Sequence, residues 1–199
     1  YRFLASLYLR PPSDSLLGMI REGSILPAFT PGSGEEDPGS HGATPLVHLQ
    51  EFVTQARGLS DLEEELAAEH TALFVLPSGV IPHEAFYLDT GKRLGGRVTI
   101  AVEQFYRRAG ISILGRCIEM PDHLGIELEF MAVLCRLEGD LEGAGEMAAV
   151  QRCLEFQRTF LEEHLSLWAP ECCERVIALA QYGFYKAIAR FTTEFLRSE

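Results

Sequence analysis

The segment from His123 to Leu137 is apolar almost all the way round when it is placed on a helical wheel. At about 100° per residue, its polar positions Gly125, Glu129 and Arg136 fall into one narrow strip. A helix with so little polar surface must be covered on most sides by other helices. The segment therefore predicts a bundle of several helices with this one in the interior.

Signals for helix ends and further helices surround this segment. Asp122 is a favourable N-cap for it, and Gly139 is a favourable stop. Apolar side chains spaced by three and four residues recur through most of the chain, whereas the two-residue alternation of strands is scarce. One such run extends from Cys173 to Phe195, and it predicts a single long final helix.

These patterns together predict an all-α protein, a single globular multi-helix bundle that forms one domain over residues 1–199. Residues 76–97 are rich in glycine and proline, so we expect them to be mostly connection. Residues 28–44 are too polar and too rich in glycine to pack, and they predict a flexible loop.

Composition narrows the possible functions. A net charge of −12 argues against nucleic acid as a partner, because nucleic-acid binding requires a basic surface. No apolar run approaches the ~20 residues of a membrane span, so we expect no stable membrane insertion. The five cysteines are odd in number and lack a C-x-x-C pair, which favours reduced thiols in a cytoplasmic protein.

Two glutamates fall among apolar positions. Glu127 projects beside Met131 and Leu134, one turn after His123, and a carboxylate there favours its neutral form unless a donor is near. His123 is the expected partner. The pair is either a core contact that fixes the helix start or a polar spot at the base of a binding cleft, and the pattern favours neither. Glu69 interrupts the apolar seam of an earlier helix in the same way.

Common enzyme signatures are missing from the sequence. The sequence contains no phosphate-binding G-x-x-x-x-G-K, no G-x-S-x-G and no H-E-x-x-H, and no histidine follows a glutamate by three residues. The remaining enzyme hypothesis is a metal-dependent helical enzyme built on His123, Glu127 and Glu69. It is the weaker hypothesis, because a second ligand pair at suitable spacing is missing.

Several short motifs follow one another in a fixed order. They are Leu73-Phe74 with Pro77; Pro82 with Phe86-Tyr87-Leu88-Asp89; Glu119 to Gly125 with Glu127-Leu128; Phe160 with His164-Leu165 and Trp168-Ala169-Pro170; and Phe184-Tyr185. Each motif alone is weak, but the ordered set is specific. In this order and spacing the chain resembles the TorD/DmsD family of cytoplasmic chaperones for molybdenum-containing oxidoreductases.

The resemblance implies a cytoplasmic chaperone without catalytic turnover and without a cofactor of its own. Its partners would be an apo-molybdoenzyme catalytic subunit, held during cofactor insertion, and that subunit's twin-arginine leader peptide. Such a leader offers two guanidinium groups and then an apolar stretch, so its receptor needs carboxylates beside an apolar groove. The expected client-binding residues are Leu73, Phe74, Pro77, Glu84, Phe86, Tyr87, Pro121, Asp122, His123 and Glu127, with Glu69 as a further source of charge.

Overall fold

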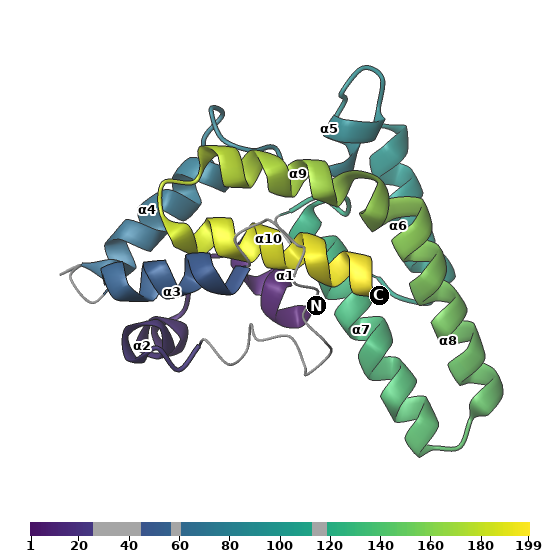
Figure 1. The fold of residues 1–199 in the computed structure, drawn as a ribbon. Coiled ribbons are helices and arrows are strands. Elements are labelled where there is room, and N and C mark those ends of the chain that lie inside the picture. The colour runs from purple at the N-terminus through teal and green to yellow at the C-terminus, as the bar shows by residue number, and fades with distance from the viewer. Residues whose placement is uncertain (26–44, 57–60, 113–118) are drawn as a thin grey trace, which may run out of the picture. The chain divides into compact units, whose positions relative to one another are not determined.

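The computed structural model describes residues 1–25, 45–56, 61–112 and 119–199. Every extended regular element in these residues is a helix, and no β-strand forms among them (Figure 1). The predicted all-α, multi-helix fold is therefore confirmed. The loop predicted at 28–44 lies outside the described residues. Among the helices that the structure describes, none combines the length and the apolar character needed to cross a membrane.

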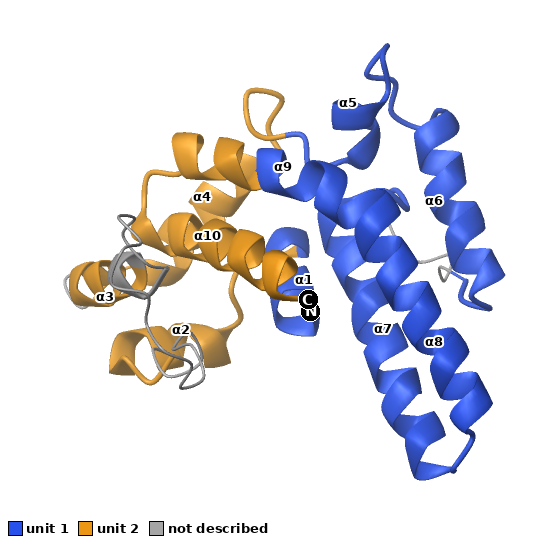
Figure 2. Cartoon of the chain, turned by 45° about the vertical axis from the view of Figure 1, so that its right-hand side comes forward, with its two compact units in different colours: residues 1–9, 81–172 blue, residues 10–80, 173–199 orange. Residues whose placement is uncertain are grey.

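The helices divide between two compact units. In chain order they are α1 (Arg2–Leu9), α2 (Asp14–Glu22), α3 (Pro45–Ala56), α4 (Leu62–Phe74), α5 (Glu84–Leu88), α6 (Arg97–Arg108), α7 (Leu124–Gly143), α8 (Met147–Phe160), the π-helical turn η2 (Leu161–Leu165), α9 (Ser166–Leu179) and α10 (Gly183–Ser198). Unit 1 comprises residues 1–9 and 81–172, and unit 2 comprises residues 10–80 and 173–199 (Figure 2). The chain passes between the units three times, and the last of these boundaries falls within α9.

Unit 1 is built around α7, which packs against α1 and α8. The expected helix from His123 to Leu137 is wrong at both ends. His123, not Asp122, is the N-cap, and α7 runs on through Gly139 to Gly143. A glycine inside a helix costs only about 1 kcal/mol relative to alanine, so it does not end a helix that continues to pack on a neighbour.

The start of α7 approaches α1 closely at Gly125. A Cβ built there would lie 2.5 Å from Cγ of Leu9 and 3.1 Å from the carbonyl oxygen of Ala5. Only a residue without a side chain fits this contact. The helical wheel placed Gly125 among polar positions, but the residue is buried because two helices meet over it.

Unit 2 pairs α3 with α10, and α2 packs against α3 and α4. Its core includes Phe52, whose ring lies 5.6 Å from that of Phe184. The single final helix predicted from Cys173 to Phe195 is wrong. The structure has α9 and α10 instead, with a break between Leu179 and Gly183. The apolar spacing continues across the break because both helices bury a face in the same core.

Candidate functional site

Two of the sequence motifs lie side by side in unit 1. The backbone N–H of Glu84 donates to the carbonyl of Asp122 over 2.9 Å, and the N–H of Leu124 donates to the carbonyl of Pro82 over 2.8 Å. These bonds form an isolated antiparallel bridge between His83 and His123. The bridge fixes the segment that leads into α5 against the segment that leads into α7.

Asp122 strengthens this junction with its side chain, which is completely buried. Its Oδ2 accepts the backbone N–H of Ala85 at 3.1 Å, and its Oδ1 lies 3.6 Å from Nδ1 of His83. The second distance is too long for a good hydrogen bond but short enough for electrostatic attraction. Burial raises the pKa of Asp122, but attraction to the nearby His83 ring, together with hydrogen bonds from Ala85 and Thr99, outweighs burial and leaves the pKa below its usual value. Asp122 is therefore an anion at neutral pH.

His123 caps α7 through its imidazole ring. Nδ1 accepts the backbone N–H of Gly125 at 3.0 Å, so this nitrogen is unprotonated and a neutral ring carries its proton on Nε2. The ring meets that of His83 edge to face at 5.1 Å. The predicted capping function thus belongs to the histidine, and the neighbouring aspartate is left to hold α5.

Glu84, the first residue of α5, makes a second buried pair. Its two carboxylate oxygens lie 3.1 and 2.9 Å from Nδ1 of His164. His164 sits in the π-helical turn η2 and stacks on Phe160 at 4.8 Å between ring centroids. Such turns insert an extra residue into a helix and recur at functional positions. Here the turn aims an imidazole into the core of unit 1.

Glu127 is fully buried beside this pair, and its hydrogen-bond partner is Trp168. The indole N–H donates to Oε2 of Glu127 at 3.1 Å, whereas the expected partner His123 engages Gly125. Burial, reinforced by the nearby carboxylate of Glu84, raises the pKa of Glu127 well above 4.5. A proton on Glu127 allows it to donate to Glu84, which replaces repulsion between two carboxylates by a hydrogen bond.

The aromatic residues of α5 border the buried network. Tyr87 stacks on Trp168 with centroids 5.4 Å apart, and the ammonium group of Lys92 lies 4.4 Å above the ring of Phe86. Both aromatic residues are half-buried. Pro121 is also half-buried, and its carbonyl accepts the hydroxyl of Tyr106 at 2.8 Å.

The structure brings most of the predicted client-binding residues together, but not all of them. Those that meet in unit 1 are Glu84, Phe86, Tyr87, Pro121, Asp122, His123 and Glu127. Leu73, Phe74 and Pro77 belong to unit 2. Leu73 is buried there, Phe74 meets the edge of His70 at 5.1 Å between ring centroids, and Pro77 is exposed.

Three members of the buried network were not predicted as site residues. His164 and Trp168 belong to a recognised motif, but nothing in their spacing shows that they would meet Glu84 and Glu127. His83 had no signal of its own beyond its place next to Glu84. Long-range pairs of this kind follow from how the helices pack, which local periodicity does not encode.

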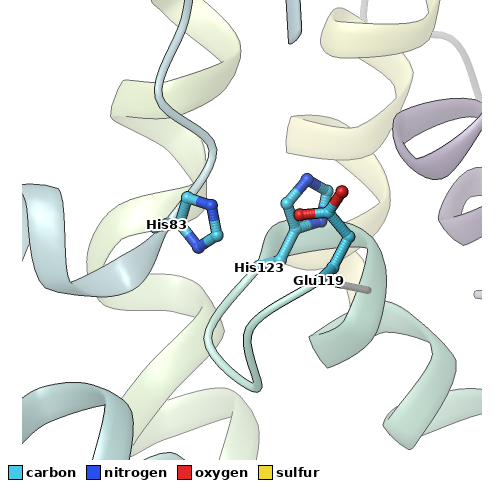
Figure 3. A group of neighbouring side chains, drawn as sticks. All are labelled: His83, Glu119 and His123. Carbon is cyan, nitrogen blue, oxygen red and sulfur yellow. The ribbon is translucent and has the colours of Figure 1, made fainter. Parts of the chain in front are cut away.

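A different set of possible metal ligands also emerges. The metal hypothesis named His123, Glu127 and Glu69, but Glu127 binds Trp168 and Glu69 is engaged within unit 2 by the backbone N–H groups of Gln181 and Tyr182. The trio whose ligand atoms lie within 4.8 Å of one another is His83, Glu119 and His123 (Figure 3).

The donor atoms of this trio fit a metal ion poorly. Because Nδ1 of His123 accepts the N–H of Gly125, the neutral ring holds its proton on Nε2, and a metal ligand nitrogen must be unprotonated. A metal on Nε2 would require the cap of α7 to break. The geometry is that of a capped helix start with an exposed glutamate beside it.

Comparison with known proteins gives the same assignment as the motifs. Residues 38–174 match the family model described as nitrate reductase delta subunit. The chain is 25% identical over its whole length to the chaperone protein TorD of Vibrio cholerae serotype O1, and covers 88% of that protein. It is 23% identical to TorD of Vibrio parahaemolyticus (99% of this chain, 89% of that protein) and 26% identical to TorD of Vibrio vulnificus (98% and 88%).

The family match covers more than half of the chain, and the relatives span nearly all of it. Both agree with an all-helical fold. The chain therefore belongs to the nitrate reductase delta subunit family, as a TorD-like chaperone and not an enzyme.

Proposed function

We propose that this chaperone binds the catalytic subunit of a molybdoenzyme in the cytoplasm before the molybdenum cofactor is inserted. It would also bind the subunit's twin-arginine leader peptide and so hold back export until insertion is complete. The support is the family assignment, together with motifs whose order matches that of molybdoenzyme chaperones. The chaperone itself would contribute binding surface and no chemistry.

The observation that carries this proposal is the complete burial of the Asp122 carboxylate. Enclosing a charge is costly, and His123 already caps α7, so the helix start does not require it. What Asp122 does hold is the backbone N–H of Ala85 in α5. The buried charge thus fixes the turn before α7 against α5, and both segments carry side chains on the surface.

We call these side chains the client surface of unit 1: Phe86, Leu88, Glu119, Met120 and Pro121. Leu88 and Met120 are each 38% exposed, Glu119 is exposed, and Phe86 and Pro121 are half-buried. An apolar surface with a carboxylate suits a peptide in which basic residues precede an apolar stretch. Asp122, His123, Glu84 and Glu127 would act beneath this surface, as positioning residues rather than as contacts.

Co-purification tests the proposal. The tagged chaperone is expressed with a molybdoenzyme catalytic subunit in cells able or unable to make the cofactor. We expect it to capture the subunit that lacks cofactor and to release the loaded one. Parallel captures with the leader peptide alone and with the leaderless subunit separate the two binding activities.

Asp122→Asn and Asp140→Asn provide the matched pair of variants. Asp140 is exposed near the end of α7, so its change alters net charge equally without touching the junction. We expect Asp122→Asn alone to reduce capture. Equal capture of loaded and unloaded subunits, or no capture of either, would overturn the proposed function.

A further inference from the structure

The break between α9 and α10 is stabilised by a carboxylate from α4. Oε1 of Glu69 accepts the backbone N–H groups of Gln181 and Tyr182 at 2.6 and 2.8 Å. These donors lie just before α10, where a helix start leaves N–H groups without intrahelical partners. These two hydrogen bonds explain why a glutamate interrupts the apolar seam of α4. They use only one of its two carboxylate oxygens.

The other oxygen of Glu69 has no donor in the part of the chain that the structure describes. Oε2 is buried, the residue is only 6% exposed, and a buried acceptor without a partner is costly. Lys186 is near enough to lower the pKa of Glu69, but burial outweighs it and raises that pKa overall. A carboxylate in this state gains from any cation that reaches Oε2.

Glu69 lines a pocket that lies entirely within unit 2. Its volume is about 290 Å³, and its lining comprises Glu65, Ala68, Glu69, Ala72, Leu73, Ser78, Gly79, Leu179, Gln181 and Tyr182. The volume is near the lower end of ligand pockets, which suits a single side chain better than a whole cofactor. Two of the lining residues are acidic, and none is basic.

The floor of the pocket is made of small residues on α4 and the loop after it. Gly79 lies so close to α4 that a Cβ there would collide with the carbonyl oxygens of Ala72 and Leu73. Any larger residue at Gly79 would push this loop away from α4. The close packing therefore preserves the shape of the pocket.

Glu65 stands one turn before Glu69 on α4 and supplies the second carboxylate. Its Oε2 accepts the hydroxyl of Tyr182, which holds the tyrosine ring at the pocket. Leu179 is 50% exposed and lines the same pocket, and Leu76, in the loop after α4, is 49% exposed. The pocket thus combines two carboxylates, an aromatic ring and the exposed apolar side chain of Leu179.

We propose that this pocket is the subsite for an arginine side chain of the client's leader peptide. The inference rests on the proposed function and adds to it a residue-level site in unit 2. The guanidinium group would bind the carboxylates of Glu69 and Glu65 with separate N–H donors. Its methylene stem would lie on Leu179.

Arginine fits this pocket better than lysine for two reasons. Its planar fork of donors can bind two carboxylates at once, whereas an ammonium group acts as a point charge. Guanidinium groups also stack on aromatic rings, and Tyr182 offers one. A leader with lysine in place of the bound arginine should therefore bind more weakly.

The first experiment needs no knowledge of the client. Acetyl-arginine amide and its neutral isostere acetyl-citrulline amide are titrated into the ¹⁵N-labelled full chain and followed by NMR. We expect the arginine compound to shift the backbone N–H signals of Gln181 and Tyr182, and the citrulline compound to leave them unchanged. Equal shifts from both compounds, or none from either, would overturn the subsite.

Glu69→Gln is the informative variant, because the amide oxygen of glutamine can still accept the two backbone N–H groups while the charge is lost. We expect this variant to bind the arginine compound and an Arg-Arg leader peptide about tenfold or more weakly than the wild type does. Glu65→Gln should also weaken the binding of both compounds. Glu64→Gln is the control, since Glu64 is exposed on the same helix and is not part of the pocket lining.

The leader titration also separates the two proposals. If the wild-type chain does not bind the leader, the leader-binding part of the proposed function fails, and the leader is excluded as the occupant. If the wild-type chain binds it and the Glu69→Gln and Glu65→Gln variants bind it equally well, only the subsite is overturned. The subsite is supported if Glu69→Gln lowers the affinity for the Arg-Arg leader but does not lower the affinity for a leader whose arginines are replaced by glutamine.

Discussion

The indole N–H of Trp168 donates to Oε2 of Glu127 over 3.1 Å, and both side chains are completely buried. This bond joins α9 to α7 inside unit 1. The other side of Glu127 faces Glu84, which in turn binds His164. A chain of polar side chains therefore runs through the buried part of unit 1, and its protonation should affect the stability of the fold.

The first prediction concerns the pH dependence of Glu127. Its native pKa lies above the usual 4.5, so the native state keeps a proton that the unfolded chain has lost. The free energy of unfolding should therefore fall as pH rises from about 4.5 to the native pKa and level off above it. In the Glu127→Gln variant the side chain stays neutral and still accepts the indole N–H of Trp168. This variant should therefore abolish the decline in unfolding free energy.

Urea unfolding followed by circular dichroism between about pH 5 and about pH 8 measures this effect. We expect Glu127→Gln to gain stability relative to the wild type as pH rises. Glu129→Gln, on the exposed side of the same helix, should keep the wild-type pH profile. Parallel pH profiles for wild type and Glu127→Gln would contradict the shared-proton geometry.

Asp122 should show the opposite pH dependence. Its native pKa lies below 3.8 because attraction to His83, together with hydrogen bonds from Ala85 and Thr99, outweighs burial. Its contribution is present above about pH 3.8 and is lost as pH falls through the native pKa. Asp122→Asn should lower the free energy of unfolding by about 1–3 kcal/mol at neutral pH. This difference from the wild type should shrink in acid, whereas a constant difference would mean that the charge is unimportant.

Gly125 and Gly139 are a matched pair in α7. Gly125→Ala should destabilise the chain by about 1–3 kcal/mol, because the new Cβ meets Leu9 and the carbonyl of Ala5. Gly139→Ala meets no atom within 4 Å and should stabilise the helix by up to about 1 kcal/mol. Thermal and urea unfolding of both variants checks the opposite signs. Equal effects would show that α1 does not pack on α7 as described.

The sequence predicted the helical fold well, because apolar spacing of three and four residues is a local signal that survives without knowledge of contacts. It failed where a side chain from elsewhere decides the outcome. The break before Gly183 depends on Glu69 from α4. The apolar spacing of the sequence on either side of this break is that of a continuous helix. The start of α7 was misassigned by one residue, since His123 caps as well as the more usual Asp122 would.

The candidate site could be predicted only in part, because it too depends on contacts between distant parts of the chain. The motif residues around α5 and α7 do meet in unit 1, but the depth of each side chain depends on tertiary packing. Asp122 was expected at a binding surface and is wholly buried, whereas Met120 is more exposed. The pairing of Glu127 with Trp168 joins residues far apart in sequence, and no periodic pattern connects them.

The final prediction separates the client surface from the network beneath it. Met120 lies in the turn held by Asp122, and its flexible side chain is 38% exposed. Met120→Glu should weaken capture of the unloaded client subunit about tenfold, because it places a charge where an apolar contact is proposed. Unfolding free energy should change little. The control is Met147→Glu, since Met147 is 63% exposed at the start of α8. If both variants reduce capture equally, or neither does, the client does not bind at the turn before α7.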